Sequence, residues 1–131
     1  MKNIALIIED NEQNLYLATF LLERSNFTVV QARSGPEGIE LAGRVRPDII
    51  LLDIQLPQMD GYAVARELRR NQALKDVPIV AVTSYAMVGD RERTLEAGCN
   101  GYLEKPIKPD IFTSQIAGFL KTRREGEGSK S

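Results

Sequence analysis

Apolar residues occur along this chain in short unbroken runs that alternate with longer amphipathic segments. Runs of this kind predict buried strands, and we place them at residues 3–10, 27–32, 47–53, 77–84 and 101–105. The segments between and after them repeat their apolar residues with a helical period, at residues 11–26, 34–46, 61–71, 89–98 and 109–124. Strict alternation of strands and helices predicts an α/β fold, with a parallel sheet covered on both faces.

Local signals support these helices. Asn11 suits an N-cap, Pro36 suits a first helical turn, and Gly98 suits a helix end. The predicted core residues of the first helix are Leu15, Ala18, Leu21 and Leu22, and those of the last are Ile111, Ile116, Phe119 and Leu120. We predict one domain over residues 1–124, followed by a small, polar and disordered tail over residues 125–131.

Polar residues follow the predicted strands where each strand ends. In the segment PDIILLDIQLP, an apolar run ends on the carboxylate of Asp53, and a proline follows four residues later. Taken alone, an acid at a strand end is usually a loop residue. However, the carboxyl ends of parallel strands meet at one edge of a sheet, where such folds bind their ligands. The residues expected to converge there are Glu9, Asp10, Asp53, Thr83, Ser84, Lys105 and Pro106.

This combination of side chains favours phosphoryl chemistry. Three carboxylates repel one another unless a cation lies between them. With oxygen ligands and no histidine in the chain, the fitting ion is Mg²⁺. Asp53 could then attack a phosphoryl group whose oxygens are neutralised by the ion and by Lys105, with a hydrogen bond from the Thr83 hydroxyl. We therefore predict that Asp53 becomes phosphorylated.

Composition narrows the alternatives. The chain has 131 residues, 43% of them hydrophobic, which suits one domain with its own core. No histidine is present, so His-ligated metals and His-based catalytic triads are excluded, and the single Cys99 cannot form an internal disulfide. A net charge of −1 gives no case for nucleic acid or an anionic membrane as partner. We expect a cytoplasmic protein.

Four segments together resemble the receiver domain of bacterial two-component response regulators. They are LIIEDN, PDIILLDIQLPQMDG, IVAVTSYA and AGCNGYLEKPI, in that order and spacing, and the resemblance covers roughly residues 3–121. It is strongest to stand-alone receivers and to those of hybrid kinases. It implies a doubly wound, five-stranded parallel sheet with flavodoxin-like strand order 2-1-3-4-5 and five helices.

The resemblance also implies a role for each site residue. Glu9, Asp10, Asp53 and the backbone carbonyl of Gln55 would hold Mg²⁺, and Asp53 would accept the phosphoryl group. Lys105 would bind that group, Thr83 would be the switch hydroxyl, Tyr102 the switch aromatic, and the Lys105–Pro106 bond would be cis. Gly61 would allow a sharp turn before the third helix. One departure is Glu9, because the first acid of this family is commonly Asp; the longer arm would reach the ion through water.

The partners implied are a histidine kinase or a histidine phosphotransfer protein. Signal output would pass through the face formed by the fourth helix, fifth strand and fifth helix, to a downstream protein or a second copy. Two alternatives stay open: a phosphorylation-independent scaffold with a receiver fold, and a small phosphatase of the haloacid-dehalogenase type. We interpret RELRR and KTRRE as solvated helix faces, and expect Met87, Leu95 and Cys99 in the core or an interface.

Overall fold

Strands and helices alternate as the sequence pattern predicts. The computed structural model describes residues 2–84 and 88–129. Its strands are β1 (Asn3–Ile8), β2 (Phe27–Ala32), β3 (Ile49–Asp53), β4 (Ile79–Thr83) and β5 (Gly101–Glu104). Its helices are α1 (Glu12–Arg24), α2 (Gly35–Val45), α3 (Gly61–Arg70), the short 3₁₀ helix η1 (Gln72–Leu74), α4 (Val88–Glu96) and α5 (Pro109–Ser129).

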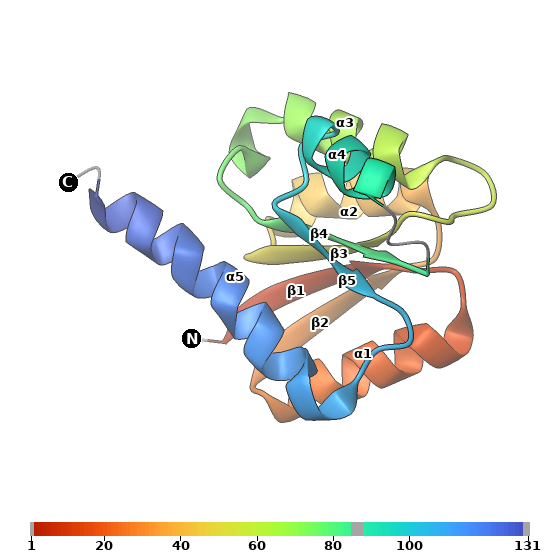
Figure 1. Ribbon diagram of the computed structural model, residues 1–131. Helices are drawn as coiled ribbons and strands as arrows, with labels where there is room; N and C mark the ends of the chain where they lie inside the picture. Colours follow the sequence, from red (N-terminus) through yellow and green to blue (C-terminus); the bar gives the residue numbers. More distant parts are fainter. Residues whose placement is uncertain (1, 85–87, 130–131) are drawn as a thin grey trace.

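The five strands form one parallel sheet in the order β2-β1-β3-β4-β5 (Figure 1). Helices α1 and α5 cover one face, and α2, α3 and α4 cover the other (Figure 1). This confirms the predicted doubly wound sheet and its flavodoxin-like order. Because both faces are covered, the central strands are apolar throughout and not alternating.

Successive residues of the central strands point to opposite faces of the sheet and pack in two separate hydrophobic cores. Ile49 and Leu51 of β3 pack with Leu15 and Leu22 of α1 and with Phe112 of α5. The intervening strand residues turn to the other face, where the core includes Ile50, Leu52, Val64, Leu68 and Leu74. This two-sided burial holds β3 rigidly in the middle of the sheet, so the side chain at its carboxyl end has a fixed position.

Side-chain caps begin the helices that start near this end of the sheet. The Asn11 side chain accepts a hydrogen bond of 2.9 Å from the amide of Asn14, which confirms the predicted N-cap. Asp60 caps α3 through a 2.9 Å bond from the amide of Tyr62. After α4, Gly98 has a φ of +104°, which confirms the predicted helix end.

One core assignment, that of Ile111, was wrong. Ile111 is 40% exposed and Phe112 is buried at 1% exposed, because Phe112 and not Ile111 lies on the same helix face as the buried Ile116 and Leu120. Leu95, expected in the core or an interface, is 49% exposed on α4 and therefore not in the core, whereas Cys99 is buried. Met87 lies outside the described residues.

The interpretation of RELRR as a solvated face was wrong for one residue. The Arg69 side chain reaches across from α3 and donates hydrogen bonds to the carbonyls of Gly98 and Leu74 and to the Asn100 side chain, at 2.7–2.8 Å. Arg70 in the same run remains exposed and pairs only with Glu67 among the contacts described. A charge pattern alone cannot reveal this difference, because it depends on the carbonyls that meet at the end of α4.

The last helix is longer than the sequence indicated. α5 continues to Ser129, so the helix end expected at residue 124 is too early, and the tail predicted as disordered is helical over most of its length. Residues 125–129 contain two glycines and a serine, which favour helix poorly, so the sequence pattern did not predict this extension. Within residues 2–84 and 88–129, no helix combines the length and apolar character needed to cross a membrane.

Candidate functional site

The end of β1 delivers two acids to the rim of the sheet. Glu9 directly follows the strand, and its amide donates a 2.9 Å hydrogen bond to the carbonyl of Ala32. Its side chain is turned inward and Glu9 is only 5% exposed, while Asp10 is exposed. The Glu9 carboxylate accepts a 3.3 Å bond from the amide of Asn11. The N-cap residue of α1 therefore also positions a buried acid.

Asp53 is the last residue of β3 and is 3% exposed. Its Oδ1 accepts a 2.9 Å hydrogen bond from the amide of Gln55, which fixes the carboxylate relative to the following loop. The Gln55 side-chain carbonyl in turn accepts a 3.5 Å bond from the amide of Ser84, across to the loop after β4. The apolar strand β3 therefore holds one charged side chain rigidly at the rim of the sheet.

Lys105 links the two buried acids. Its Nζ lies 3.1 Å from Glu9 Oε1 and 3.2 Å from Asp53 Oδ1, with only 12% of its side chain exposed. Burial alone lowers the pKa of Lys105, but the charges of Asp53 and Glu9 outweigh it and the pKa is raised. The lysine is therefore a fixed cation. The peptide bond that follows it, to Pro106, is cis as expected.

The three acids form a cluster of oxygen ligands. Glu9, Asp10 and Asp53 each contribute a carboxylate oxygen, and these oxygens all lie within 4.8 Å of one another. Burial, followed by the hydrogen bond and charge of Asp53, raises the pKa of Glu9 to about 7, although Lys105 and the Asn11 amide oppose this. An all-oxygen donor set with excess negative charge fits Mg²⁺ and does not suit softer metals.

Thr83 and Tyr102 lie on the two strands next to this cluster. Thr83 ends β4 and is 5% exposed, and its carbonyl accepts a 2.9 Å bond from the amide of Lys105. Tyr102 lies within β5 opposite Ala81 of β4, and it is partly buried against the core on the α2 to α4 side. The structure thus brings Thr83 beside the lysine of the site, with Tyr102 on the neighbouring edge strand.

The turn after β3 depends on Gly61. Its amide donates a 3.1 Å hydrogen bond to the carbonyl of Ile54. A Cβ at this position would lie 2.4 Å from the Cα of Ile54 and 2.8 Å from the carbonyl oxygen of Asp53, which is closer than real contacts allow. Only glycine permits the backbone of α3 to approach the end of β3 this closely. This agrees with the sharp turn expected from the sequence.

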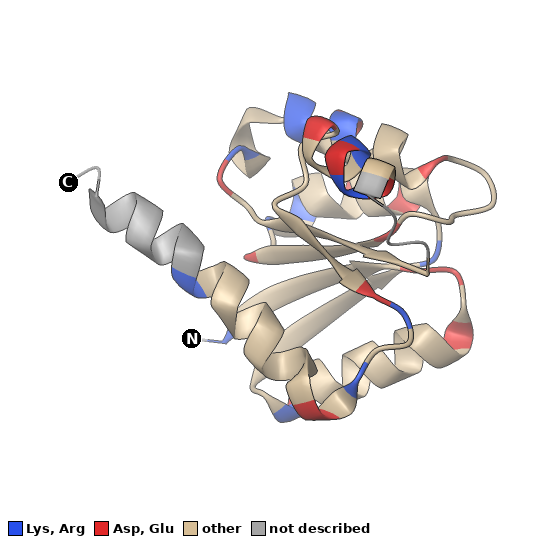
Figure 2. Cartoon of the chain, in the orientation of Figure 1, with Lys and Arg blue, Asp and Glu red and all other residues tan. Residues whose placement is uncertain are grey.

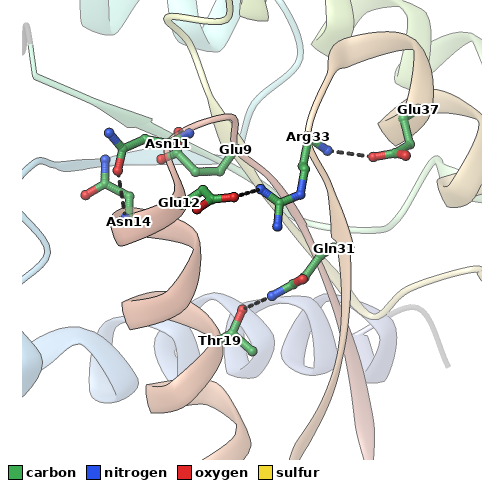
Figure 3. A network of polar contacts seen from close by, with 8 residues as sticks. All are labelled: Glu9, Asn11, Glu12, Asn14, Thr19, Gln31, Arg33 and Glu37. Atoms are coloured by element: carbon green, nitrogen blue, oxygen red, sulfur yellow. Dashed lines mark hydrogen bonds and ion pairs between the residues drawn. The ribbon is translucent and has the colours of Figure 1, made fainter.

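A further polar network braces α1 against β2 beside the acids (Figure 3). Arg33 pairs with Glu12 at 3.0 Å, and the amide of Arg33 donates to Glu37 at the start of α2. Gln31 donates a 2.9 Å bond to Thr19. The sequence pattern gave no indication of these contacts, because they join residues on different elements.

Comparison with known proteins identifies the class. The family described as the response regulator receiver domain matches residues 5–117. The polar-differentiation response regulator DivK of Brucella ovis is 41% identical over 120 residues, covering 92% of this chain and 98% of that protein. The chain therefore belongs to the response regulator receiver domain family, the phosphoacceptor signalling domains of two-component systems, which interact with histidine kinases and phosphotransfer proteins.

Solved structures agree with this assignment. The receiver domain of a sensor histidine kinase from Pseudomonas aeruginosa is 35% identical, with a TM-score of 0.84, covering 92% of this chain and 99% of that one. That structure holds a magnesium ion coordinated in its active site cleft. A response regulator from Chloroflexus aurantiacus is 26% identical with a TM-score of 0.87, at the same coverage of both chains. The scaffold and phosphatase alternatives are not favoured by these likenesses.

Proposed function

We propose that Asp53 is the phosphoacceptor of this receiver domain. The observation that carries the proposal is a buried carboxylate held on two sides, by the amide of Gln55 at 2.9 Å and by Lys105 Nζ at 3.2 Å. A fixed nucleophile beside a fixed cation is suited to attack on an anionic phosphoryl group. Glu9 and Asp10 complete the acid cluster but lie at the end of another strand.

The donor would be a phosphohistidine of a histidine kinase or of a histidine phosphotransfer protein. An Asp53 oxygen forms a bond to phosphorus while the bond from phosphorus to the imidazole nitrogen breaks, and its electron pair stays with the imidazole. Lys105 offsets the charge on the phosphoryl oxygens, and the Thr83 hydroxyl donates a hydrogen bond to one of them. In dephosphorylation, water attacks phosphorus and the bond from phosphorus to the Asp53 oxygen breaks, which restores the carboxylate and releases phosphate.

The acid cluster would hold Mg²⁺ through Glu9, Asp10, Asp53 and the carbonyl of Gln55. When bound, the ion supplies positive charge that offsets both the acids and the incoming phosphoryl oxygens. One Glu9 oxygen contacts Lys105 Nζ and the other accepts from the Asn11 amide, so Glu9 would contribute to the ion site mainly through its charge.

The experiment is labelling of the purified protein with acetyl phosphate, followed by intact-protein mass spectrometry. We expect one phosphoryl group in Mg²⁺ and none after chelation with EDTA. Asp53→Asn should abolish labelling, whereas Asp76→Asn, at an exposed position away from the cluster, should label as the wild type does. Equal labelling of Asp53→Asn would reassign the phosphoacceptor. Rapid turnover without a stable product would favour a phosphatase, and no reaction a scaffold.

We further propose that output passes through the surface of α4, β5 and α5. A groove of about 280 Å³ lies between β5 and α5, lined by residues that include Tyr102, Glu104, Ile107, Lys108, Ile111 and Gln115. Ile111 in this groove and Leu95 on α4 are exposed apolar side chains. Since Thr83 and Tyr102 adjoin this surface, a Thr83 hydroxyl drawn toward the phosphoryl group opens space for the Tyr102 ring.

This output proposal is tested by affinity measurements. Partner binding or self-association, titrated with and without beryllofluoride, should differ by about 5- to 150-fold, as allosteric coupling typically gives. The variant Ile111→Ser should weaken binding in both states. Equal affinities in both states, together with an unmoved Tyr102 ring, would overturn the output proposal and leave Asp53 phosphorylation intact.

A further inference from the structure

Helix α1 carries an exposed aromatic ridge that the receiver chemistry does not use. Tyr16 is 71% exposed and Phe20 is 43% exposed, and their rings stack with centroids 6.3 Å apart and planes 13° from parallel. The Arg24 guanidinium lies 5.6 Å from the centre of the Phe20 ring. With Glu12 one turn before Tyr16, these residues form a row of four spaced at every fourth position, which we call the α1 stripe. Two adjacent exposed aromatic rings on one helix face favour a docking function.

No other element of the described chain covers this stripe. The core side of α1 consists of Leu15, Ala18 and Leu22, whereas all four stripe residues are exposed. From residue 13 to residue 22 the helix has no charged residue, and its charges lie at its two ends (Figure 2). Glu12 contacts Arg33 at 3.0 Å, but both side chains are more than half exposed, so this pair is weak and leaves Glu12 available (Figure 3).

The order of charges along the stripe indicates which kind of surface would be complementary to it. Along α1 the order is acid, aromatic, aromatic, base, with Glu12 and Arg24 separated by about 18 Å of helix. If a second α1 lies antiparallel about a two-fold axis at residue 18, Tyr16 faces Phe20 of the other copy. Glu12 then faces Arg24 of the other copy, at both ends. The stripe is therefore complementary to itself, which is the condition for an isologous contact.

We propose that two copies of this chain associate through their α1 stripes. Rows of residues at every fourth position pack into one another with helix axes crossing at about −50°, the commonest class of helix packing. This contact is separate from the groove between β5 and α5, so it goes beyond the proposed output surface. It is also small: two aromatic side chains per copy bury far less than the about 800 Å² per partner of a standard interface, so a dissociation constant of about 0.1–1 mM is expected.

The test uses unmodified protein in sedimentation equilibrium at concentrations up to about 1 mM, chosen to span the expected constant. Phe20→Ala should lower the association constant by about tenfold, since one central aromatic contact is removed from each side. Glu12→Arg and Arg24→Glu should each abolish association alone, because each places like charges opposite one another. Mixed together, these two variants should associate again, because every facing pair is then of opposite charge.

The matched control reverses charges on another helix. Glu40→Arg and Arg44→Glu change an exposed pair on α2, and both should associate as the wild type does. A wild type that stays monomeric up to about 1 mM would overturn the proposal. So would single variants that fail to associate when mixed, or association that is lost in Ile111→Ser and kept in Phe20→Ala. A monomeric chain that binds a histidine phosphotransfer protein through Tyr16 and Phe20 would assign the stripe to that partner instead.

Discussion

Lys105 Nζ contacts Glu9 Oε1 at 3.1 Å, although the two residues follow strands at different positions in the sheet. Glu9 is longer by one methylene than the Asp common at its position in this family, and its carboxylate reaches the lysine that also contacts Asp53. The lysine therefore balances two buried acids at once. The presence of Glu in place of the common Asp thus has a structural consequence. The Glu9 carboxylate belongs to the acid cluster and also forms an ion pair with Lys105.

Replacing this lysine should destabilise the protein. Lys105→Met leaves the Glu9 and Asp53 carboxylates buried side by side without a cation between them. We expect the free energy of unfolding in EDTA to fall by about 2–4 kcal/mol, below the loss seen for fully buried pairs because the Lys105 side chain is 12% exposed. Added Mg²⁺ should restore part of this loss in the variant. Urea denaturation followed by circular dichroism measures both effects.

Lys108→Met is the matched control for that measurement. Lys108 follows the same strand, lies outside the acid cluster and should change stability by less than about 0.5 kcal/mol. If Lys105→Met is as stable as Lys108→Met in EDTA, Lys105 does not balance the acids. If Mg²⁺ raises the stability of neither variant, the acid cluster does not hold the ion.

A methyl group at Gly61 should strain the loop that supports Asp53. The added Cβ would lie 2.4 Å from backbone Cα of Ile54, and a backbone neighbour cannot rotate away as a side chain can. We expect Gly61→Ala to lower the free energy of unfolding by about 2–4 kcal/mol. Gly118→Ala on α5 is the control, since nothing lies within 4 Å of its added Cβ, and it should instead raise stability by about 0.5–1 kcal/mol. Equal effects of the two substitutions in thermal unfolding would contradict this account of the turn.

The sheet and the position of the acid cluster could be predicted from the sequence pattern. Apolar runs identified the strands, and the parallel topology then placed Glu9, Asp53 and Lys105 at one edge. Contacts between distant elements were not predictable in this way. The pairing of Lys105 with Glu9 and the insertion of Arg69 against the end of α4 depend on side-chain reach and on which carbonyls lie nearby. The burial of Phe112 instead of Ile111 could have been predicted, because Phe112 precedes Ile116 by four residues on one helix face.

Arg69 should be far more important for stability than its neighbour Arg70. Its guanidinium donates to the carbonyls of Gly98 and Leu74 and to Asn100, whose side-chain oxygen also accepts a 2.8 Å bond from the amide of Ile79. Arg69→Met removes these donors and leaves the partly buried carbonyls of Gly98 and Leu74 without them, so we expect a loss of about 1–3 kcal/mol. Arg70→Met, on the exposed face, should change stability by less than about 0.5 kcal/mol. Similar denaturation midpoints for both variants would restore the interpretation of this segment as a solvated face.

Cys99 should be unreactive in the folded protein at moderately alkaline pH. It is 5% exposed, and burial raises the pKa of its thiol to about 11, only partly opposed by the charge of Arg69. The reactive thiolate is therefore scarce at pH 8.5 in the folded state but not in the unfolded state. We expect iodoacetamide at this pH to modify Cys99 in urea and to leave the native protein unmodified, as mass spectrometry can measure.

The same shift sets the sign of a pH effect on stability. The folded protein holds the thiol proton of Cys99 more tightly than the unfolded chain does. Cys99 therefore contributes stability that is fully present below pH 9.0, the ordinary pKa of a cysteine thiol. This contribution is lost as the pH rises from 9.0 to about 11. Cys99→Ser or Cys99→Ala should therefore show a smaller decrease in the free energy of unfolding across this interval than the wild type. A wild type and a Cys99→Ala variant with parallel pH profiles between 9.0 and about 11 would mean that burial does not perturb this thiol.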